Sequence, residues 1–214
     1  KKPIWSAKPV FEKSKPRKGE LALDGRWRIL LPPDAPDQVQ LAAEDLRGFL
    51  AAAAGLKLVV GVGAPGKGVP CISLELDPKP IQAEAFEIEL GARGIALRGD
   101  ASGLMYGCFH LEELMRFREA PILSIGTIRR SPSLETRILR SPMAFFHGKE
   151  LEGILDAYPE AYLNKLAHHG VNGIWLRGKL HELARVAAFP EFGLAAEPVL
   201  QDLRALVARS ARYG

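Results

Sequence analysis

The amino-acid sequence predicts an α/β protein in two parts: an α+β domain whose sheet is packed by helices, then a stretch of alternating strands and helices. The chain has 214 residues, enough for one or two domains, and its 47% apolar content is typical of a globular protein. Before residue 128, short β-rich runs surround two amphipathic helix patterns. After residue 129, strand and helix patterns alternate, which indicates parallel strands joined by crossover helices.

Residues 1–20 are predicted to form a basic, extended arm. They contain seven of the chain's 29 lysines and arginines, two of its 25 acidic residues and several prolines. The net charge of +4 therefore belongs to the arm, and the rest of the chain is almost neutral. No predicted element concentrates the basic and aromatic residues that a nucleic-acid-binding face needs, so we expect no nucleic-acid partner.

The α+β domain is predicted over residues 21–128. It opens with two short strands, Leu21–Leu23 and Trp27–Leu31, which we expect to pair as a hairpin. The residues between them, Asp24–Gly25, tolerate the positive φ angles of a tight turn. Two prolines at positions 32 and 33 end the second strand.

A helix follows the second strand. Asp34 and Asp37 are its alternative N-caps, and Gly55 is the expected C-terminal stop. Apolar residues recur three and four positions apart and define its buried face: Val39, Leu41, Ala42, Leu46, Phe49 and Leu50.

The next two strands, Leu56–Val62 and Cys71–Leu76, are separated by the glycine-rich segment Gly61–Gly68. We interpret this segment as a flexible connection rather than a phosphate-binding loop, because Pro65 removes an amide donor and no helix follows. Cys71 and Cys108 lack metal-ligand spacing. They are expected to be small buried side chains, with a single disulfide as the alternative.

A second hairpin, Phe86–Leu90 with Ile95–Arg98, shows the strict alternation of a sheet with one wet face. Asp100 or Ser102 then caps a helix that runs through Met115 and packs on this hairpin. Pro121–Ile128 closes the domain as an apolar strand.

Residues 129–214 are predicted to contain two strand-helix units. Thr136–Phe146 and Gly173–Leu176 are the strands, and Tyr158–His169 and Pro198–Arg212 are the helices. Gly170 is the expected stop of the first helix. Because two such units cannot form a stable body alone, we expect the native chain to continue beyond Gly214.

The segment Glu84–Leu114 resembles the accessory domain that precedes the catalytic barrel in glycoside hydrolase family 20, the β-N-acetylhexosaminidases. Related domains precede the barrels of α-glucuronidases. The shared features are two strands around a glycine turn and an Asp-x-x-Gly-x-x-x-Gly helix entry formed by Asp100, Gly103 and Gly107. The two glycines lie on one helical face and let the helix approach the sheet.

The resemblance extends to Pro132–Arg137, which is similar to the first barrel strand of the family, and to Tyr162–Leu176, which is similar to the first barrel helix and second strand. It therefore covers residues 21–214 and implies that residues 129–214 are the first two βα units of a (β/α)8 barrel. It also implies that the catalytic Asp-Glu pair follows the fourth strand, beyond these residues.

The candidate substrate-binding residues lie around the two predicted barrel strands. By resemblance, Arg137 holds hydroxyls of the terminal sugar, with Arg140 as the competing register. The carboxyl ends of barrel strands carry the chemistry of this fold, and they would present His147, Trp175 and Arg177. Aromatic rings stack on sugars and guanidinium groups bind vicinal hydroxyls or carboxylates.

No metal or cofactor is expected, since the neighbouring histidines His168 and His169 cannot face one ion. The stretch Trp175–Lys179 departs from the family, because it carries cations where family 20 has acidic residues and histidine. An acidic substrate is therefore the alternative to an N-acetylhexosamine.

The sequence supports three alternative hypotheses for the function. The first is the N-terminal part of a β-N-acetylhexosaminidase-like glycoside hydrolase that acts on terminal sugars of glycans, inactive as this fragment alone. The second is an α-glucuronidase-like exo-hydrolase of uronic-acid-containing glycans, and the third is a non-catalytic carbohydrate-binding or scaffold protein. The expected partner is a carbohydrate. We expect no membrane insertion and an extracellular or periplasmic location, and the oligomeric state is left open.

Overall fold

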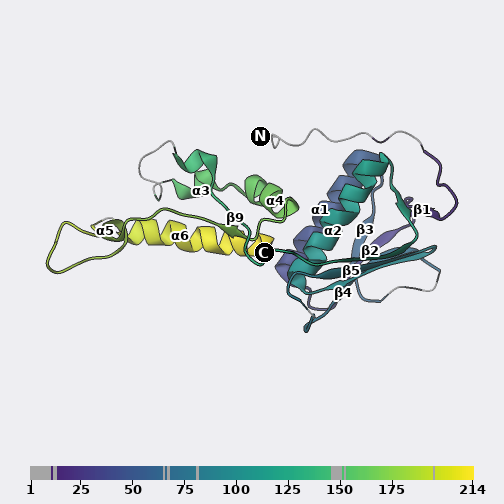
Figure 1. Cartoon of the computed structure of the whole chain (residues 1–214), viewed down its shortest axis with the longest axis horizontal. Coiled ribbons are helices and arrows are strands. Elements are labelled where there is room, and N and C mark those ends of the chain that lie inside the picture. Colours follow the sequence, from purple (N-terminus) through teal and green to yellow (C-terminus); the bar gives the residue numbers. More distant parts are fainter. Residues whose placement is uncertain are drawn as a thin grey trace. The chain divides into compact units, whose positions relative to one another are not determined.

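The computed structural model describes residues 11, 14–64, 66, 68–80, 82–145, 151, 153–194 and 196–214 (Figure 1). The chain divides into two compact units, Lys1–Ser133 and Leu134–Gly214. The boundary expected from the sequence, after residue 128, falls inside the last strand of the first unit. No helix in the described residues has the length and apolar character needed to cross a bilayer.

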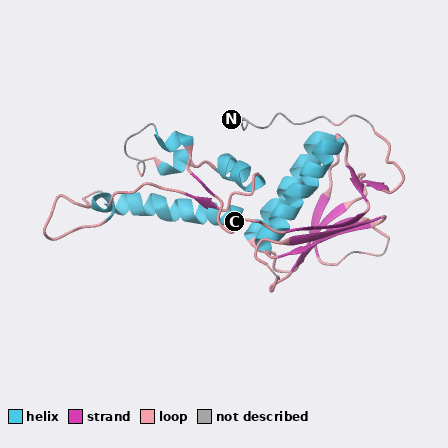
Figure 2. Ribbon diagram, viewed as in Figure 1, coloured by secondary structure: helices cyan, strands magenta, loops and turns pink. Residues whose placement is uncertain are grey.

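A six-stranded mixed sheet forms the body of the first unit, in the order β3-β2-β4-β6-β5-β8 (Figure 2). The strands β3, β2, β4 and β6 are parallel to one another. β5 pairs antiparallel with β6, and the edge strand β8 pairs antiparallel with β5. The strands are β2 (Arg28–Leu31), β3 (Val59–Val62), β4 (Cys71–Leu76), β5 (Phe86–Gly91), β6 (Gly94–Gly99) and β8 (Gly126–Arg130).

Two 18-residue helices, α1 (Asp37–Ala54) and α2 (Ala101–Arg118), cover one face of this sheet (Figure 2). The strands alternate apolar residues toward the helices with polar residues on the other face. Side chains without solvent exposure fill the layer between the sheet and the helices: Ile29, Leu46, Leu50, Ile72, Ile88, Leu97, Leu104 and Leu111. The expected fold of this part, a sheet packed by helices, is confirmed.

The entry of α2 follows the prediction closely. Asp100 caps the helix, since its carboxylate accepts a hydrogen bond from the Gly103 amide at 2.7 Å and a second from the Glu84 amide at 2.9 Å. The two glycines allow a close approach to the sheet. A Cβ atom at Gly103 would lie 2.2 Å from the Ala85 carbonyl oxygen, and one at Gly107 would lie 2.4 Å from the side chain of Leu97.

The hairpin expected around Asp24–Gly25 does not form. Strand β1 (Glu20–Ala22) pairs with β7 (Ile122–Ser124) in a separate two-stranded antiparallel sheet, whereas β2 joins the parallel part of the large sheet. The Asp24 carboxylate accepts a hydrogen bond from the Arg26 amide at 2.9 Å and pairs with the Arg26 guanidinium at 2.6 Å. This local turn redirects the chain from one sheet to the other instead of folding it back on itself.

The N-cap predictions for α1 are also wrong, and its C-terminal stop is confirmed. Pro36 occupies the N-cap position without a side-chain hydrogen bond, because the proline ring has no polar atom that could accept one from the first helical amides. Gly55 has φ 71° at the other end. Near this end, the described part of the N-terminal arm places the Phe11 ring edge-on against Phe49 at 5.8 Å.

The glycine-rich segment joins β3 to β4, which lie on opposite sides of β2. Its expected role as a connection between strands is confirmed, although Pro65 and Lys67 are outside the described residues. Cys71 and Cys108 are both free and buried, which settles the alternative left open by the sequence in favour of two small core side chains.

The second unit begins with two parallel strands, β9 (Ile138–Leu139) and β10 (Gly173–Ile174). The prediction of a strand over Thr136–Phe146 is wrong. Pro142 has no amide hydrogen to donate to a neighbouring strand, and it starts the 3-10 turn Pro142–Phe145. Gly170 ends the intervening helix with φ 74°, as expected. The helices are α3 (Ile154–Ala157), α4 (Glu160–His168), α5 (Leu180–Leu183) and α6 (Ala196–Ser210), with the 3-10 turn Ala211–Tyr213 after them.

Candidate functional site

A cation and an aromatic ring meet where the two parallel strands of the second unit end. Arg140 directly follows β9 and Trp175 directly follows β10, so both lie at the carboxyl edge of the strand pair. The Arg140 guanidinium carbon is 5.0 Å from the centroid of the Trp175 ring, within the range of a cation–π contact. The indole is 51% exposed, so it remains accessible to a ligand.

A buried tyrosine connects the same two strand ends. The Tyr158 hydroxyl accepts a hydrogen bond from the Ser141 amide at 2.9 Å and donates one to the Trp175 carbonyl at 3.2 Å. Neither Tyr158 nor Ser141 has any solvent exposure. We use the name strand-end site for the four residues Arg140, Ser141, Tyr158 and Trp175.

Sequence reasoning missed Tyr158 and Ser141 and placed Tyr158 inside the helix. The sequence does contain a signal, because Pro159 disfavours helical dihedrals at the residue before it. Tyr158 accordingly has φ −130° and ψ 62°, between α3 and α4. This position lets the ring point into the interior rather than follow the surface of a helix.

Arg137 lies at the other end of the strand pair, one residue before β9. Its amide donates to the Asn172 side-chain oxygen at 2.8 Å, and its guanidinium donates to the carbonyls of Leu134, at 2.6 Å, and Gly170. These contacts join it to the loop between α4 and β10. The structure therefore brings Arg140 and Trp175 together and places Arg137 at the opposite, amino-terminal edge.

The remaining candidates are more peripheral. Arg177 is exposed, two residues beyond Trp175, and the neighbouring cation Lys179 pairs with Glu182 at 3.4 Å. His147 is outside the described residues. His168 has a ring nitrogen 2.9 Å from the Asn164 carbonyl oxygen, and the His169 amide caps the end of α4, so both histidines have local structural contacts.

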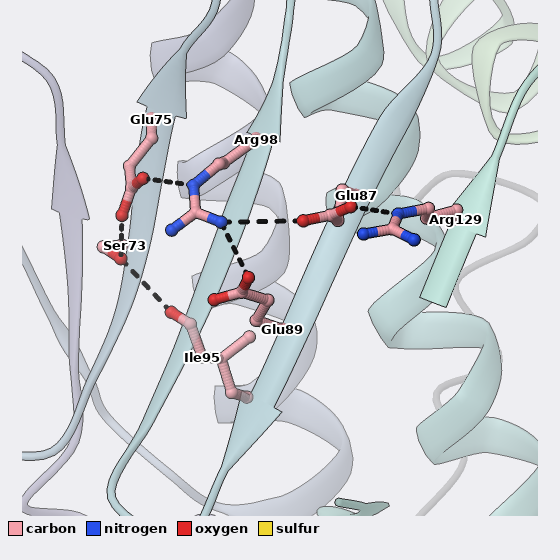
Figure 3. Close-up of polar contacts among 7 residues, drawn as sticks. All are labelled: Ser73, Glu75, Glu87, Glu89, Ile95, Arg98 and Arg129. Carbon is pink, nitrogen blue, oxygen red and sulfur yellow. Dashed lines mark hydrogen bonds and ion pairs between the residues drawn. The ribbon is translucent and has the colours of Figure 1, made fainter. Parts of the chain in front are cut away.

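The carboxylates on the open face of the large sheet belong to a closed network of ion pairs (Figure 3). Arg98 donates to Glu75 at 2.8 Å, contacts Glu89 at 2.9 Å and reaches Glu87 at 3.6 Å, and Glu87 also pairs with Arg129. The hydrogen bonds to Glu75 and Glu89 raise the pKa of Arg98. With each carboxylate held by a guanidinium, this face has the cross-strand pairing of a stable sheet rather than an acid-base pair.

An open hollow of about 1060 Å³ lies over part of this face, between the Gly66–Pro70 loop and the Gly91–Gly94 turn. A sugar site usually offers an aromatic ring. Trp27 is the single aromatic residue among the described residues that line the hollow, and it is only 4% exposed. The strand-end site, with its half-exposed indole, is therefore the better candidate for a carbohydrate.

The described chain is thus an α+β domain with two helices on one face of a mixed sheet, followed in the sequence by two parallel strands joined through helices. Residues 8–129 match the family model described as glycosyl hydrolase family 20, domain 2. This is more than half of the chain, and the chain belongs to this family. The resemblance predicted from Glu84–Leu114 is confirmed.

Solved structures of similar fold come from glycoside hydrolases. The chitobiase of Flavobacterium johnsoniae has a TM-score of 0.62 at 14% identity, over 95% of this chain and 32% of its own. The exo-β-N-acetylglucosaminidase of Vibrio harveyi has a TM-score of 0.57 at 16% identity, over 97% of this chain and 35% of its own. A GH138 enzyme targeting pectin rhamnogalacturonan II has a TM-score of 0.62 at 13% identity, over 87% of this chain and 29% of its own.

These similarities concern the fold, and in each case the chain spans only about a third of the other protein's length. A comparison with curated protein sequences gave no match.

Proposed function

We propose that this chain is the N-terminal part of a β-N-acetylhexosaminidase-like glycoside hydrolase that acts on terminal sugars of extracellular or periplasmic glycans. The observation that carries the proposal is the family 20 domain over residues 8–129, directly followed by parallel strands whose carboxyl ends present an arginine and a half-exposed tryptophan. In barrel enzymes this is the edge at which substrates bind.

Two side chains of the strand-end site, Arg140 and Trp175, have complementary roles in this proposal. The Trp175 ring stacks on the apolar face of a pyranose, because its indole is half exposed and its backbone is tied to the neighbouring strand by a 2.9 Å hydrogen bond to the Leu139 carbonyl. Arg140 donates to hydroxyl oxygens at the edge of the same sugar. Glycoside hydrolysis also needs a pair of carboxyl groups at a defined separation. In our proposal, polypeptide outside these 214 residues supplies that pair.

A uronic-acid glycan is the second candidate substrate. Two observations favour it: the exposed guanidinium of Arg177 lies two residues from Trp175, and one of the similar structures belongs to an enzyme targeting pectin rhamnogalacturonan II. A carboxylate on the sugar would bind to a guanidinium through paired hydrogen bonds, which a neutral N-acetylhexosamine does not offer.

The decisive experiment is a binding titration, with N-acetylglucosamine and with glucuronic acid, of the longer protein to which our proposal assigns this chain. The variant Trp175→Ala removes the stacking surface. Phe189→Ala is its matched control, because Phe189 is an aromatic residue of the same unit with the same 51% exposure. We expect Trp175→Ala to weaken sugar binding about tenfold or more, a loss of about 1.4 kcal/mol, and Phe189→Ala to leave it unchanged.

The two sugars distinguish the two candidate substrates. Tighter binding of N-acetylglucosamine supports a hexosaminidase-like protein, and tighter binding of glucuronic acid that depends on Arg177 supports a uronic-acid glycan as the substrate. Binding of neither sugar, or equal losses in the two alanine variants, contradicts a sugar site at the strand ends. We also expect the 214-residue chain alone to release no nitrophenol from a nitrophenyl N-acetyl-β-glucosaminide. Measurable turnover would refute the proposal that the catalytic carboxyl pair lies outside these residues.

A further inference from the structure

The Tyr158 hydroxyl holds the two strand ends of the second unit together from inside. It contacts the first backbone amide beyond Arg140, that of Ser141, and the carbonyl of Trp175. We propose that Tyr158 is a positioning residue, which fixes Trp175 and Arg140 in the geometry that binds the sugar. This inference rests on the proposed function of the strand-end site.

The backbone of Trp175 is tied on both sides of its side chain. Its amide donates to the Leu139 carbonyl at 2.9 Å, and its carbonyl accepts from the Tyr158 hydroxyl at 3.2 Å. The first hydrogen bond is part of the pairing between β9 and β10, whereas the second depends on the Tyr158 side chain. With both backbone groups held, the Cα–Cβ bond of Trp175 has a fixed direction before any ligand arrives, and the Arg140 guanidinium 5.0 Å from the ring centroid contacts the indole itself. This arrangement reduces the ordering that binding requires.

Arg140 is positioned through its neighbour Ser141. The Ser141 amide is buried and donates to the Tyr158 hydroxyl, while the Ser141 side-chain oxygen accepts from the Met143 amide at 3.2 Å at the start of the 3-10 turn. The chain therefore turns away from β9 immediately after Arg140. Removal of the tyrosine hydroxyl would leave a buried amide without its acceptor, so this turn would have to move.

Tyr158 is itself held by a helix far along the chain. Arg209 of α6 donates from one nitrogen to the carbonyls of Leu155, at 2.8 Å, and Tyr158, at 2.9 Å. The Tyr158 amide also donates to the Ile154 carbonyl at 3.2 Å. Its backbone and its ring are thus both fixed, which is what a rigid support for a binding residue requires.

The test compares Tyr158→Phe with Tyr162→Phe. Tyr162 is the matched control, because its ring lies 6.3 Å from that of Tyr158 and its hydroxyl has no hydrogen bond within the described residues. The same longer protein is labelled with 5-fluorotryptophan, and Trp175→Phe identifies the Trp175 fluorine resonance by its disappearance. The same titration with N-acetylglucosamine gives the affinity.

In the free protein we expect Tyr158→Phe to shift or broaden the Trp175 resonance and to leave the other tryptophan resonances in place. We expect Tyr162→Phe to change neither. In the titration, Tyr158→Phe should weaken binding about fivefold, and Tyr162→Phe should match the wild type. Arg209→Met, which removes the hydrogen bond to the Tyr158 carbonyl, should change the Trp175 resonance in the same sense. If Tyr158→Phe does not fold, this variant tests whether Tyr158 positions Trp175.

An unchanged Trp175 resonance in Tyr158→Phe overturns the inference, and so does an equal change in Tyr162→Phe. A shifted resonance with full affinity also overturns it, because Tyr158 would then support the fold without positioning the binding residues. If the wild-type chain binds no sugar, the proposed function fails. The resonances of the free protein still show whether Tyr158 sets the geometry of Trp175.

Discussion

The close approach of α2 to the sheet makes Gly103→Ala a sharp test of the fold. The added Cβ would lie 2.2 Å from the Ala85 carbonyl oxygen and 3.1 Å from the capping oxygen of Asp100. The obstacle is backbone rather than the flexible end of a side chain, because the added Cβ would also lie 3.0 Å from the Ala85 carbonyl carbon. The backbone at Ala85, just before β5, or that of α2 must therefore move.

The cost follows from three contributions to the free energy of unfolding. Overpacking against rigid neighbours costs about 1–3 kcal/mol, and a backbone obstacle places this site at about 3 kcal/mol. The disturbed Asp100 cap costs about 1 kcal/mol. Alanine in place of glycine within a helix returns about 1 kcal/mol. We therefore expect Gly103→Ala to destabilise the first unit by about 3 kcal/mol.

Gly48→Ala is the matched control, since Gly48 is exposed within α1 and a Cβ there would meet no atom within 4 Å. It should stabilise the protein by about 0.5–1 kcal/mol. Both variants are measured by urea unfolding with Trp27 fluorescence, in a background with Trp5 and Trp175 replaced by phenylalanine. The close-approach argument is refuted if Gly103→Ala is as stable as the parent, or if the two variants lose stability equally.

Replacing Glu20 with Gln tests its ion pair with Arg118. This pairing, together with the hydrogen bond from the Arg17 amide, lowers the pKa of Glu20 from 4.5 to about 2. The contribution of the carboxylate to stability is therefore complete above pH 4.5 and is lost as the pH falls toward 2. The difference in urea midpoint between wild type and Glu20→Gln should shrink across that range, and a pH-independent difference would count against the pair. Gly55→Ala should lose about 1 kcal/mol in the same unfolding assay, because φ is 71° at the end of α1, and an unchanged midpoint would show that the helix end tolerates a side chain. Burial raises the pKa of the Cys71 and Cys108 thiols, so a thiol-specific disulfide reagent should label neither in the native protein and both in urea, and rapid native labelling would contradict the buried positions.

Local signals in the sequence predicted the elements whose structure is decided by nearby residues. The hairpin of β5 and β6 follows from strict alternation, and the entry of α2 follows from Asp100 and the two glycines four residues apart. The hairpin around Asp24–Gly25 failed for the opposite reason. A tight-turn sequence permits a hairpin, but the residues that pair with β1 and β2 lie between 31 and 104 positions away in the sequence.

The candidate site shows the same difference between local signals and contacts that are distant in the sequence. The sequence singled out Arg140 as the alternative register to Arg137, by resemblance, and Trp175 as a residue that the second strand delivers to its carboxyl end. The structure brings the two together, because each directly follows a strand and parallel pairing places the two strand ends at one edge. The hydroxyl of Tyr158 could not be predicted as their link, because its contacts with Ser141 and Trp175 each span 17 residues. No local pattern specifies such a contact.

The sequence by itself determined the α/β class, the entry of α2, the electrically neutral body and the family, because periodicity, caps and glycine spacing are local properties of the chain. Only the tertiary structure decided the order of the six strands, the position of Arg137 at the edge opposite to Arg140, and the tyrosine that joins the two strand ends. These depend on which surfaces meet in space, and that choice is made by burial and hydrogen bonding over the whole unit rather than by any one segment.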